Sequence, residues 1–215
     1  MSRATLQPQI STPIPQGAQI QNTQAIIQIN PNVRITLLRD ERRRNLPADG
    51  ETRISINFTP AAINRELRIR KRRVRDQANA TGISPTYTIR IQSFYRNLNN
   101  RTSTSGYGRG TSENDRNAEN TSLRFHEGSH GTHWINYIRT HPLPVFNIFD
   151  GMTPREVRNE FQRTNRAFRN YINVMNQEND IEIDCPGIPI NSSDIQCPNT
   201  TPASEPTRQR VIPIE

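Results

Sequence analysis

The sequence predicts an α+β domain in which antiparallel strands are followed by two helices, with disordered tails at both ends. Residues with β propensity alternate or cluster over 33–38, 53–58 and 87–91, whereas apolar residues recur at helical spacing from about residue 121 onward. The chain has 215 residues, which is the size of one ordinary domain. Only 32% of them are hydrophobic, against about 45–50% in typical globular proteins. We therefore expect one modest core and some segments that stay unpacked.

The two ends of the chain lack periodic patterns and contain repeated prolines. We expect residues 1–31 to form a flexible Gln- and Pro-rich arm, or at most a lone strand around Ala25–Ile29. Residues 185–215 are expected to form a Pro-rich, loop-like tail. The folded unit is then residues 32–184.

No segment has the pattern of a targeting or membrane-spanning sequence. The chain has no apolar run of about eighteen residues, so we expect no transmembrane helix. The first ten residues, MSRATLQPQI, lack the apolar region of a secretory signal peptide. We therefore expect synthesis in the cytoplasm and leave the final location open, with export through a dedicated secretion or injection system as one hypothesis.

Local patterns in the first part of the folded unit predict strands and one helix. Turn residues at Pro47–Gly50 separate the segments 33–38 and 53–58, which predicts a hairpin. Apolar residues at helical spacing predict a helix over residues 60–79. They are Ile63, Leu67, Val74 and Ala78. The alternating segment Tyr87–Ile91 predicts a further strand.

Two helices are predicted in the second part. One is expected over residues 121–139 and ends before a proline-rich connector. The other begins at Thr153, because Thr153-Pro154-Arg155-Glu156 combines an N-cap, a proline at the first helical position and a capping-box glutamate. It is expected to continue to about Gln177.

The first of these helices carries the motif H-E-x-x-H, formed by His126, Glu127 and His130. Histidines four positions apart project from one face of a helix, about 6 Å apart along its axis, so both imidazoles can bind one zinc ion. Glu127 lies one position from the first ligand. From there it can act as a general base on a water molecule without binding the metal itself.

Chance is a poor explanation for this motif. One H-E-x-x-H is expected in well under about 1% of chains with this composition, and three of the four histidines fall within eight positions. A surface helix with solvated histidines is the alternative interpretation. It does not explain this clustering, nor the two glycines and the serine that weaken the helix at the motif.

The motif resembles that of the zincins, the H-E-x-x-H metallopeptidases, and the order of strand, motif helix and second helix over residues 87–180 is similar to theirs. The resemblance implies a small zincin-like domain, a Zn²⁺ cofactor, and hydrolysis of a protein or peptide substrate. It also implies that the strand Tyr87–Ile91 pairs with extended substrate. The tract from Thr121 to Gly187 is similar to uncharacterised bacterial metallopeptidase-like effector proteins, which implies an effector or toxin. The glycine and third histidine of the metzincins are absent.

The third metal ligand is not fixed by the motif. Glu160 is the first candidate, because antiparallel packing of the two helices would bring it to the height of His130. His133 is the second candidate, although on an unbroken helix it stands about 4.5 Å beyond His130 along the axis. Asp184 and Glu156 remain as further candidates, but Glu156 is better explained by the capping box.

Two other features have weaker functional interpretations. Tyr107, in a glycine-rich loop, could donate a hydrogen bond to a tetrahedral intermediate, although a loop tyrosine more often only packs. The only two cysteines, Cys185 and Cys197, could form one short disulfide loop.

Residues 68–75 hold six positive charges in eight positions. Such a block can contact an acidic partner, nucleic acid or an anionic membrane surface. We expect nucleic acid not to be the main partner, because the block has no aromatic residue on which a base could stack. An Arg-rich nucleic-acid-binding protein, or a structural or cargo protein with a non-catalytic metal, is the alternative to a zinc-dependent metallopeptidase.

Overall fold

The structure is a computed structural model that describes residues 9–58, 68–70, 73–75, 86–149, 151–190 and 195–198. Its elements, in chain order, are β1 (Gln19–Gln21), β2 (Gln24–Asn30), β3 (Val33–Leu37), β4 (Glu41–Arg42), β5 (Gly50–Phe58), β6 (Arg68–Arg70), β7 (Arg73–Arg75), β8 (Tyr87–Tyr95), η2 (Leu98–Thr102), α3 (Glu113–Asn117), α4 (Leu123–Thr140) and α5 (Pro154–Asp184). Among the helices in these residues, none has the length and apolarity that are needed to cross a bilayer.

Strand β8 is the centre of a mixed six-stranded sheet. Its odd-numbered residues, from Tyr87 to Tyr95, are buried, as expected for a strand with one face on the core. β8 pairs in parallel with β3, with Val33 opposite Tyr87, and in antiparallel with β5, with Gly50 opposite Tyr95. The prediction of antiparallel strands is therefore only partly right.

The predicted hairpin between the segments 33–38 and 53–58 is wrong, because β8 lies between β3 and β5. With β8 between β3 and β5, both edges of β8 have hydrogen-bonded partners. A local hairpin of β3 and β5 would leave an edge of β8 without a partner. For the same reason, the strand Tyr87–Ile91 has no edge left to pair with a substrate. In the described residues, β5 pairs only with β8 and forms an edge of the sheet.

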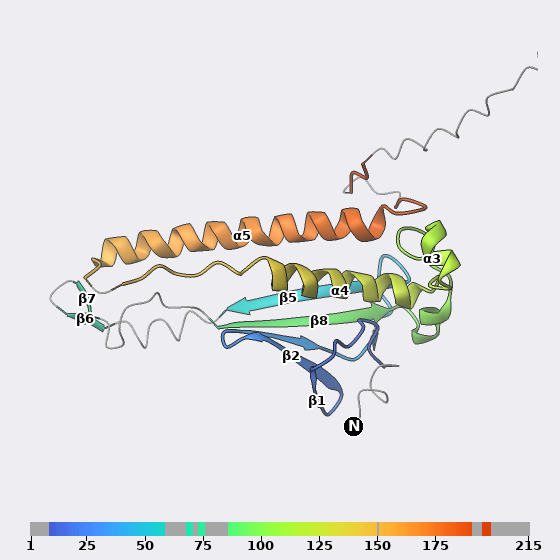
Figure 1. Ribbon diagram of the computed structural model, residues 1–215, viewed down its shortest axis with the longest axis horizontal. Coiled ribbons are helices and arrows are strands. Elements are labelled where there is room, and N and C mark those ends of the chain that lie inside the picture. Colours follow the sequence, from blue (N-terminus) through green and yellow to red (C-terminus); the bar gives the residue numbers. More distant parts are fainter. Residues whose placement is uncertain are drawn as a thin grey trace, which may run out of the picture.

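The helices form two layers on the sheet, with α4 next to β5 and α5 over α4 (Figure 1). Ser122 caps α4 by accepting a hydrogen bond from the backbone N–H of Phe125, and Trp134, Ile135 and Ile138 of this helix join the core. The capping box of Thr153 and Glu156 is confirmed. However, α5 continues to Asp184, beyond the predicted end at Gln177.

The helix predicted over residues 60–79 is wrong where the structure describes it. Arg68–Arg70 and Arg73–Arg75 are the strands of a two-stranded antiparallel ribbon. The sequences Arg-Ile-Arg and Arg-Val-Arg alternate with period two, which is the strand period, and this local pattern prevails over the wider helical spacing. The other residues of the range lie outside the described part of the chain.

Residues 9–31 are folded, so the predicted flexible arm does not extend over them. β1 and β2 form the outer strands of the sheet, and β2 contains the lone strand considered around Ala25–Ile29. Before them, residues 9–14 cross α4 as an N-terminal strap. Ile10 and Ile14 of this strap are each only 1% exposed in the core, and burial of such a side chain stabilises the fold by about 1.5–3 kcal/mol.

Polar contacts hold the strap in place. Asp40 accepts hydrogen bonds from the backbone N–H of Ser11 at 2.7 Å and from its hydroxyl at 2.9 Å. Arg124 of α4 donates to the carbonyl oxygen of Ile10 at 2.8 Å. The fold therefore begins at the strap and not at residue 32.

The strap accounts for the glycines of the motif helix. A methyl group on Gly128 would overlap the carbonyl oxygen of Ser11, and one on Gly131 would overlap the side chain of Thr12. Both glycines lie on the side of α4 where the strap crosses it. Glycine is retained at these helical positions because the two backbones approach too closely for a side chain.

The tail from residue 185 is described only in part, over residues 185–190 and 195–198, where it has no helix or strand. Cys185 and Cys197 form a disulfide with a sequence separation of 12 residues. Cys197 of the tail is therefore linked covalently to Cys185, the residue that directly follows α5.

Gly128→Ala is expected to destabilise the protein. Helix propensity alone would favour alanine by about 1 kcal/mol, but overlap with a backbone carbonyl costs about 1–3 kcal/mol, so we expect a net loss in the free energy of unfolding. Chemical denaturation measures this loss. Gly106→Ala is the control, because no atom lies within 4 Å of the added methyl group. A Gly128→Ala variant more stable than wild type would contradict the strap contact.

Candidate metal centre

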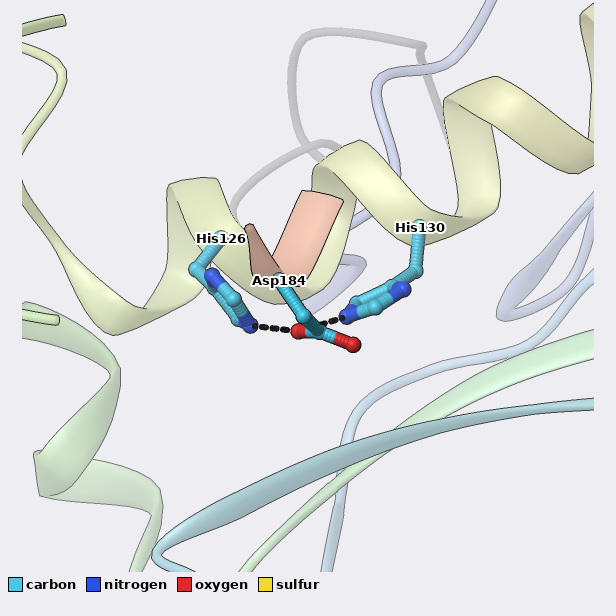
Figure 2. A group of neighbouring side chains, drawn as sticks. All are labelled: His126, His130 and Asp184. Carbon is cyan, nitrogen blue, oxygen red and sulfur yellow. Dashed lines mark ion pairs between the residues drawn. The ribbon is translucent and has the colours of Figure 1, made fainter. Parts of the chain in front are cut away.

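Helix α4 presents His126 and His130 side by side toward the C-terminal end of α5 (Figure 2). His126 is fully buried, and the side chain of His130 is 12% exposed. Their ring centroids lie 5.1 Å apart, as the four-residue spacing predicts.

Each histidine is oriented through its Nδ1 atom. His126 Nδ1 lies 3.0 Å from the carbonyl oxygen of Arg109, and His130 Nδ1 lies 2.5 Å from Oδ1 of Asn179. The Asn179 amide in turn donates to the carbonyl oxygen of His130 at 3.0 Å. A carbonyl oxygen can only accept a hydrogen bond, so each Nδ1 carries the hydrogen. Each Nε2 is therefore left with the lone pair that a metal requires.

Asp184, the last residue of α5, lies between the two Nε2 atoms. Its Oδ1 is 3.2 Å from Nε2 of His126 and 3.4 Å from Nε2 of His130. The potential ligand atoms of the three residues all lie within 4.8 Å of one another. His126 Nε2 is buried and has no hydrogen-bond partner of acceptable geometry among the described residues. This group could therefore hold a metal ion.

The electrostatics of the group follow from burial and mutual attraction. Burial alone would lower the pKa of His130, but the neighbouring Asp184 and Glu127 carboxylates raise it to about 9. Burial would raise the pKa of Asp184, but His126 and His130 lower it to about 2. The buried carboxylate is thus ionised across the physiological range and attracts either a proton on His130 or a metal cation.

The end of α5 also favours a cation. The last turn of the helix contains Glu182 and Asp184 and no basic residue. Acidic side chains at a helix C-terminus are unfavourable, because that end of the helix dipole is itself negative. A metal bound by Asp184 would relieve this repulsion.

The first two candidates for the third ligand lie elsewhere. Glu160 accepts hydrogen bonds from Arg163 and from the backbone N–H of Asn147, and it is 24 residues before Asp184 on the same helix, about 36 Å along its axis. His133 points toward Glu182, with 3.8 Å between Nε2 and Oε2. Glu156 is held in the capping box. The structure instead brings together His126, His130 and Asp184.

Glu127 lies beside this group and is only 2% exposed. Its Oε2 accepts a hydrogen bond from the hydroxyl of Thr52 on β5 at 2.8 Å. Gly50 leaves space for it, because a methyl group there would come within 2.7 Å of Oε1. Burial raises the pKa of Glu127, against the opposing effects of His130, His126 and the Thr52 hydrogen bond.

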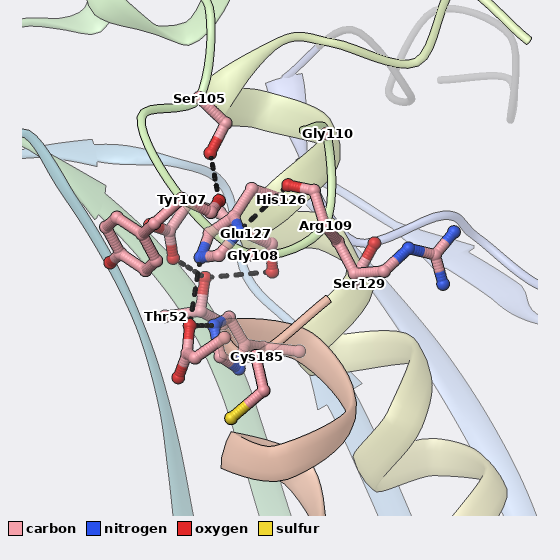
Figure 3. A network of polar contacts seen from close by, with 12 residues as sticks. Thr52, Ser105, Tyr107, Gly108, Arg109, Gly110, His126, Glu127, Ser129 and Cys185 are labelled. Atoms are coloured by element: carbon pink, nitrogen blue, oxygen red, sulfur yellow. Dashed lines mark hydrogen bonds and ion pairs between the residues drawn. The ribbon is translucent and has the colours of Figure 1, made fainter. Parts of the chain in front are cut away.

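The loop of residues 105–111 covers the other side of His126 (Figure 3). The Tyr107 ring contacts the His126 ring edge-on, with centroids 4.8 Å apart, and burial raises the pKa of its hydroxyl. Gly108 has a positive φ of 61°, and a methyl group there would lie 2.9 Å from Cε1 of His126. Only glycine allows this close approach.

The same loop is fastened to the residues around Asp184. The backbone N–H of Arg109 donates to the carbonyl oxygen of Ile183 at 2.7 Å, and that of Gly108 donates to Ile188 at 2.6 Å. The disulfide at Cys185 follows directly. One small assembly therefore sets the position of Asp184 and of the carbonyl that orients His126.

Sequence reasoning missed the residues that orient the histidines and Glu127. Asn179 and Thr52 are single polar residues in ordinary contexts, and Arg109 acts through its backbone. Among these, only the spacing of Asn179 from the end of α5 is informative, and only once Asp184 is considered together with the two histidines.

No protein-family model, curated protein or solved structure matches this chain.

If this group holds zinc, Asp184→Ala is expected to abolish stoichiometric zinc binding, as are His126→Ala and His130→Ala, because each would remove one of three candidate ligands. Elemental analysis after reconstitution measures the metal content. Glu160→Ala is the matched control, since it removes a carboxylate from the same helix but should leave about one zinc per chain. Retention of zinc by Asp184→Ala together with its loss from Glu160→Ala would contradict the assignment.

Zinc affinity is expected to rise with pH up to about pH 9, because zinc must displace the proton that His130 holds in the metal-free protein. One displaced proton corresponds to about a tenfold lower apparent dissociation constant per pH unit. Competition with a chromophoric chelator between about pH 6.5 and 8.5 measures this slope. An affinity that levels off near pH 7 would argue against the raised pKa.

Proposed function

We propose that the chain is a zinc-dependent hydrolase of the zincin type that cleaves peptide bonds. The observation that carries the proposal is the place of Glu127, which is buried beside the His126–His130–Asp184 group without belonging to it. A structural zinc site has four protein ligands and needs no neighbouring base. Three ligands with an adjacent carboxylate are the arrangement that hydrolysis requires.

The donor set fits zinc. Two imidazole nitrogens and one carboxylate oxygen would supply three of the four ligands that zinc usually takes in proteins. When bound, zinc supplies a Lewis acid that lowers the pKa of water and polarises a carbonyl group. The chain holds the two imidazoles through Arg109 and Asn179, so they need not reorganise when the metal enters.

Glu127 is the proposed general base. Its raised pKa, caused by burial, brings it closer to the range in which a carboxylate takes up and returns a proton. The Thr52 hydroxyl holds one carboxylate oxygen, which fixes the direction of the other. In this mechanism Glu127 accepts a proton from water and delivers it to the leaving amine.

Tyr107 is a proposed second participant. A tyrosine hydroxyl is protonated at neutral pH, and burial raises the pKa of Tyr107 further, so it can donate but does not carry charge. Its ring lies against His126. We propose that it donates a hydrogen bond to the oxygen on which negative charge develops.

An extended peptide is proposed to bind along β5. This strand forms an edge of the sheet in the described residues, and it carries Thr52, which contacts Glu127. A substrate that adds a strand at this edge would place its backbone next to the proposed base. The resemblance to bacterial effectors extends the proposal to a toxin with a protein target.

Deep burial favours one rival function. His126 is fully buried and Asp184 is 5% exposed, as in metal sites that only stabilise a fold. In that case the protein would be a structural or cargo protein with a non-catalytic metal. The catalytic proposal requires the loop of residues 105–111 to open for substrate.

Glu127→Gln separates the two functions. The substitution preserves size and the acceptor for Thr52, so zinc content and thermal stability should stay near wild type. Hydrolysis of a fluorescent casein, or toxicity on expression, should fall by about 10²–10⁴. Glu182→Gln is the control, because that carboxylate is close in sequence to Asp184 but 68% exposed.

Full activity of Glu127→Gln would exclude Glu127 as the base. Loss of zinc, or unfolding, would show that Glu127 has a structural role and would favour the rival function.

A further inference from the structure

The first half of α5 exposes one chemically uniform face. Its positions lie within an arc of about 160° on a helix of 100° per residue, and each holds arginine, asparagine or glutamine. We call these residues the arginine face. They are Arg155, Arg158, Asn159, Gln162, Arg163, Asn165, Arg166, Arg169 and Asn170, and all are exposed.

This face points away from the body of the protein. The opposite side of the helix buries Val157, Glu160 and Thr164 against the connector of residues 143–149, as shown by the hydrogen bond from Asn147 to Glu160. From Arg155 to Arg169 the face extends about 21 Å. Its only exposed neighbours in this half are Pro154, Glu156 and Ala167, at the first turn and at one margin.

The charges of the face are not neutralised within the described chain. Arg163 forms an ion pair with Glu160. Arg155, Arg158, Arg166 and Arg169 have no ion pair among the described residues. Arg155 also lies in the first turn of α5, where the positive end of the helix dipole makes a cation unfavourable. Arg155 therefore reduces the stability of the isolated helix.

A second arginine-rich segment forms the β6–β7 ribbon. In the β6–β7 ribbon, Arg68 is paired with Arg75, and Arg70 with Arg73. Figure 1 shows this ribbon at the same end of the long axis as the start of α5. Two arginine-rich segments therefore lie at this end of the molecule.

We propose that the arginine face binds the phosphate backbone of duplex nucleic acid. A duplex carries one negative charge per about 1.7 Å of its axis, which is a dense array over the length of this face. Arginine binds phosphate oxygens through two parallel hydrogen bonds. Arginine, asparagine and glutamine are also the side chains that contact base edges when a helix enters the major groove.

The composition of the arginine face argues against the two other anionic partners, an acidic protein and a membrane surface. Protein interfaces are anchored by aromatic and aliphatic residues at their centre, and the arginine face has none. Helices on a membrane surface insert an apolar side into the lipid, but the apolar side of α5 is packed inside the protein. Phosphate binding needs no such anchor, and a duplex needs no aromatic residue for base stacking.

Fluorescence anisotropy with a mixed-sequence DNA duplex of about 20 base pairs tests the proposal on the full chain. We expect binding at about 100 mM salt, with an affinity that falls linearly as the logarithm of salt rises. Arg166→Gln/Arg169→Gln should weaken binding by about tenfold or more and lower the salt slope by about 2. Both positions are exposed, and thermal unfolding checks that the variant folds.

The matched control is Arg34→Gln/Arg116→Gln, which removes two exposed arginines elsewhere and changes net charge equally. It should bind as wild type, because neither arginine belongs to the arginine face. Equal weakening by both arginine pairs, or no binding at about 100 mM salt, would overturn the proposal. So would polyglutamate, or phosphatidylserine vesicles, that displace the duplex at equal total charge.

Discussion

Three ionisable side chains, His126, His130 and Asp184, meet in the interior where α4 crosses the end of α5, and much of the structure serves to hold them there. Buried charges are costly unless they are paired or bind a metal. The pair formed by Asp184 and protonated His130 satisfies this requirement when no metal is bound. Below its ordinary pKa of 6.5 the raised His130 group contributes its full stability, which is lost as pH rises through about 9. The contribution of Asp184, whose pKa is lowered, is lost as pH falls from 3.8 through about 2.

The elements around the group are arranged by this constraint. The loop of residues 105–111 can lie on His126 only because Gly108 has no side chain. The strap can cross the back of α4 only because Gly128 and Gly131 have none. The disulfide at Cys185 fixes the chain directly after Asp184. These three features are far apart in sequence, but they all lie around the group formed by His126, His130 and Asp184 or around the helix that carries the two histidines.

The sequence was sufficient for the features that depend on local spacing. The motif on α4, the capping box of α5 and the alternating strand Tyr87–Ile91 are each defined by residue spacing within a single helix or strand. The third member of the metal group depended instead on where two helices meet. The prediction of Glu160 assumed that the beginning of α5 packs beside α4. That part of α5 lies against the connector, where Glu160 accepts a hydrogen bond from the backbone N–H of Asn147, and it is the last turn of α5 that reaches His130.

The pairing of the strands in the sheet could not be predicted from the sequence either. Nothing in the segments 33–38 and 53–58 reveals that β8 separates them, because the residues that decide it lie thirty positions further on. The strap was missed for a related reason. Its burial depends on glycines more than 110 positions away, and those glycines were noticed only as an unexplained weakness of the helix.

Helix α5 combines two chemistries whose charges oppose its own dipole. Its basic residues are in the first half and its last turn is acidic, so both ends are less stable alone than they would be with the charges exchanged. A 31-residue helix tolerates this cost because Val157, Met175 and Ile183 bury its other side along the whole length. Without external ions, Asp184 is paired with His130 and Arg163 with Glu160, whereas Arg155, Arg158, Arg166 and Arg169 have no ion pair among the described residues. We propose a cation at Asp184 and a polyanion along the arginine face as the external partners of the two ends. Asp184 lies about 22 Å along the axis from Arg169, the nearest arginine of the face, which is well beyond the Debye length of about 8 Å, so such ions would bind independently. The charge pattern of this one helix is therefore compatible with two separate sites on one rigid element.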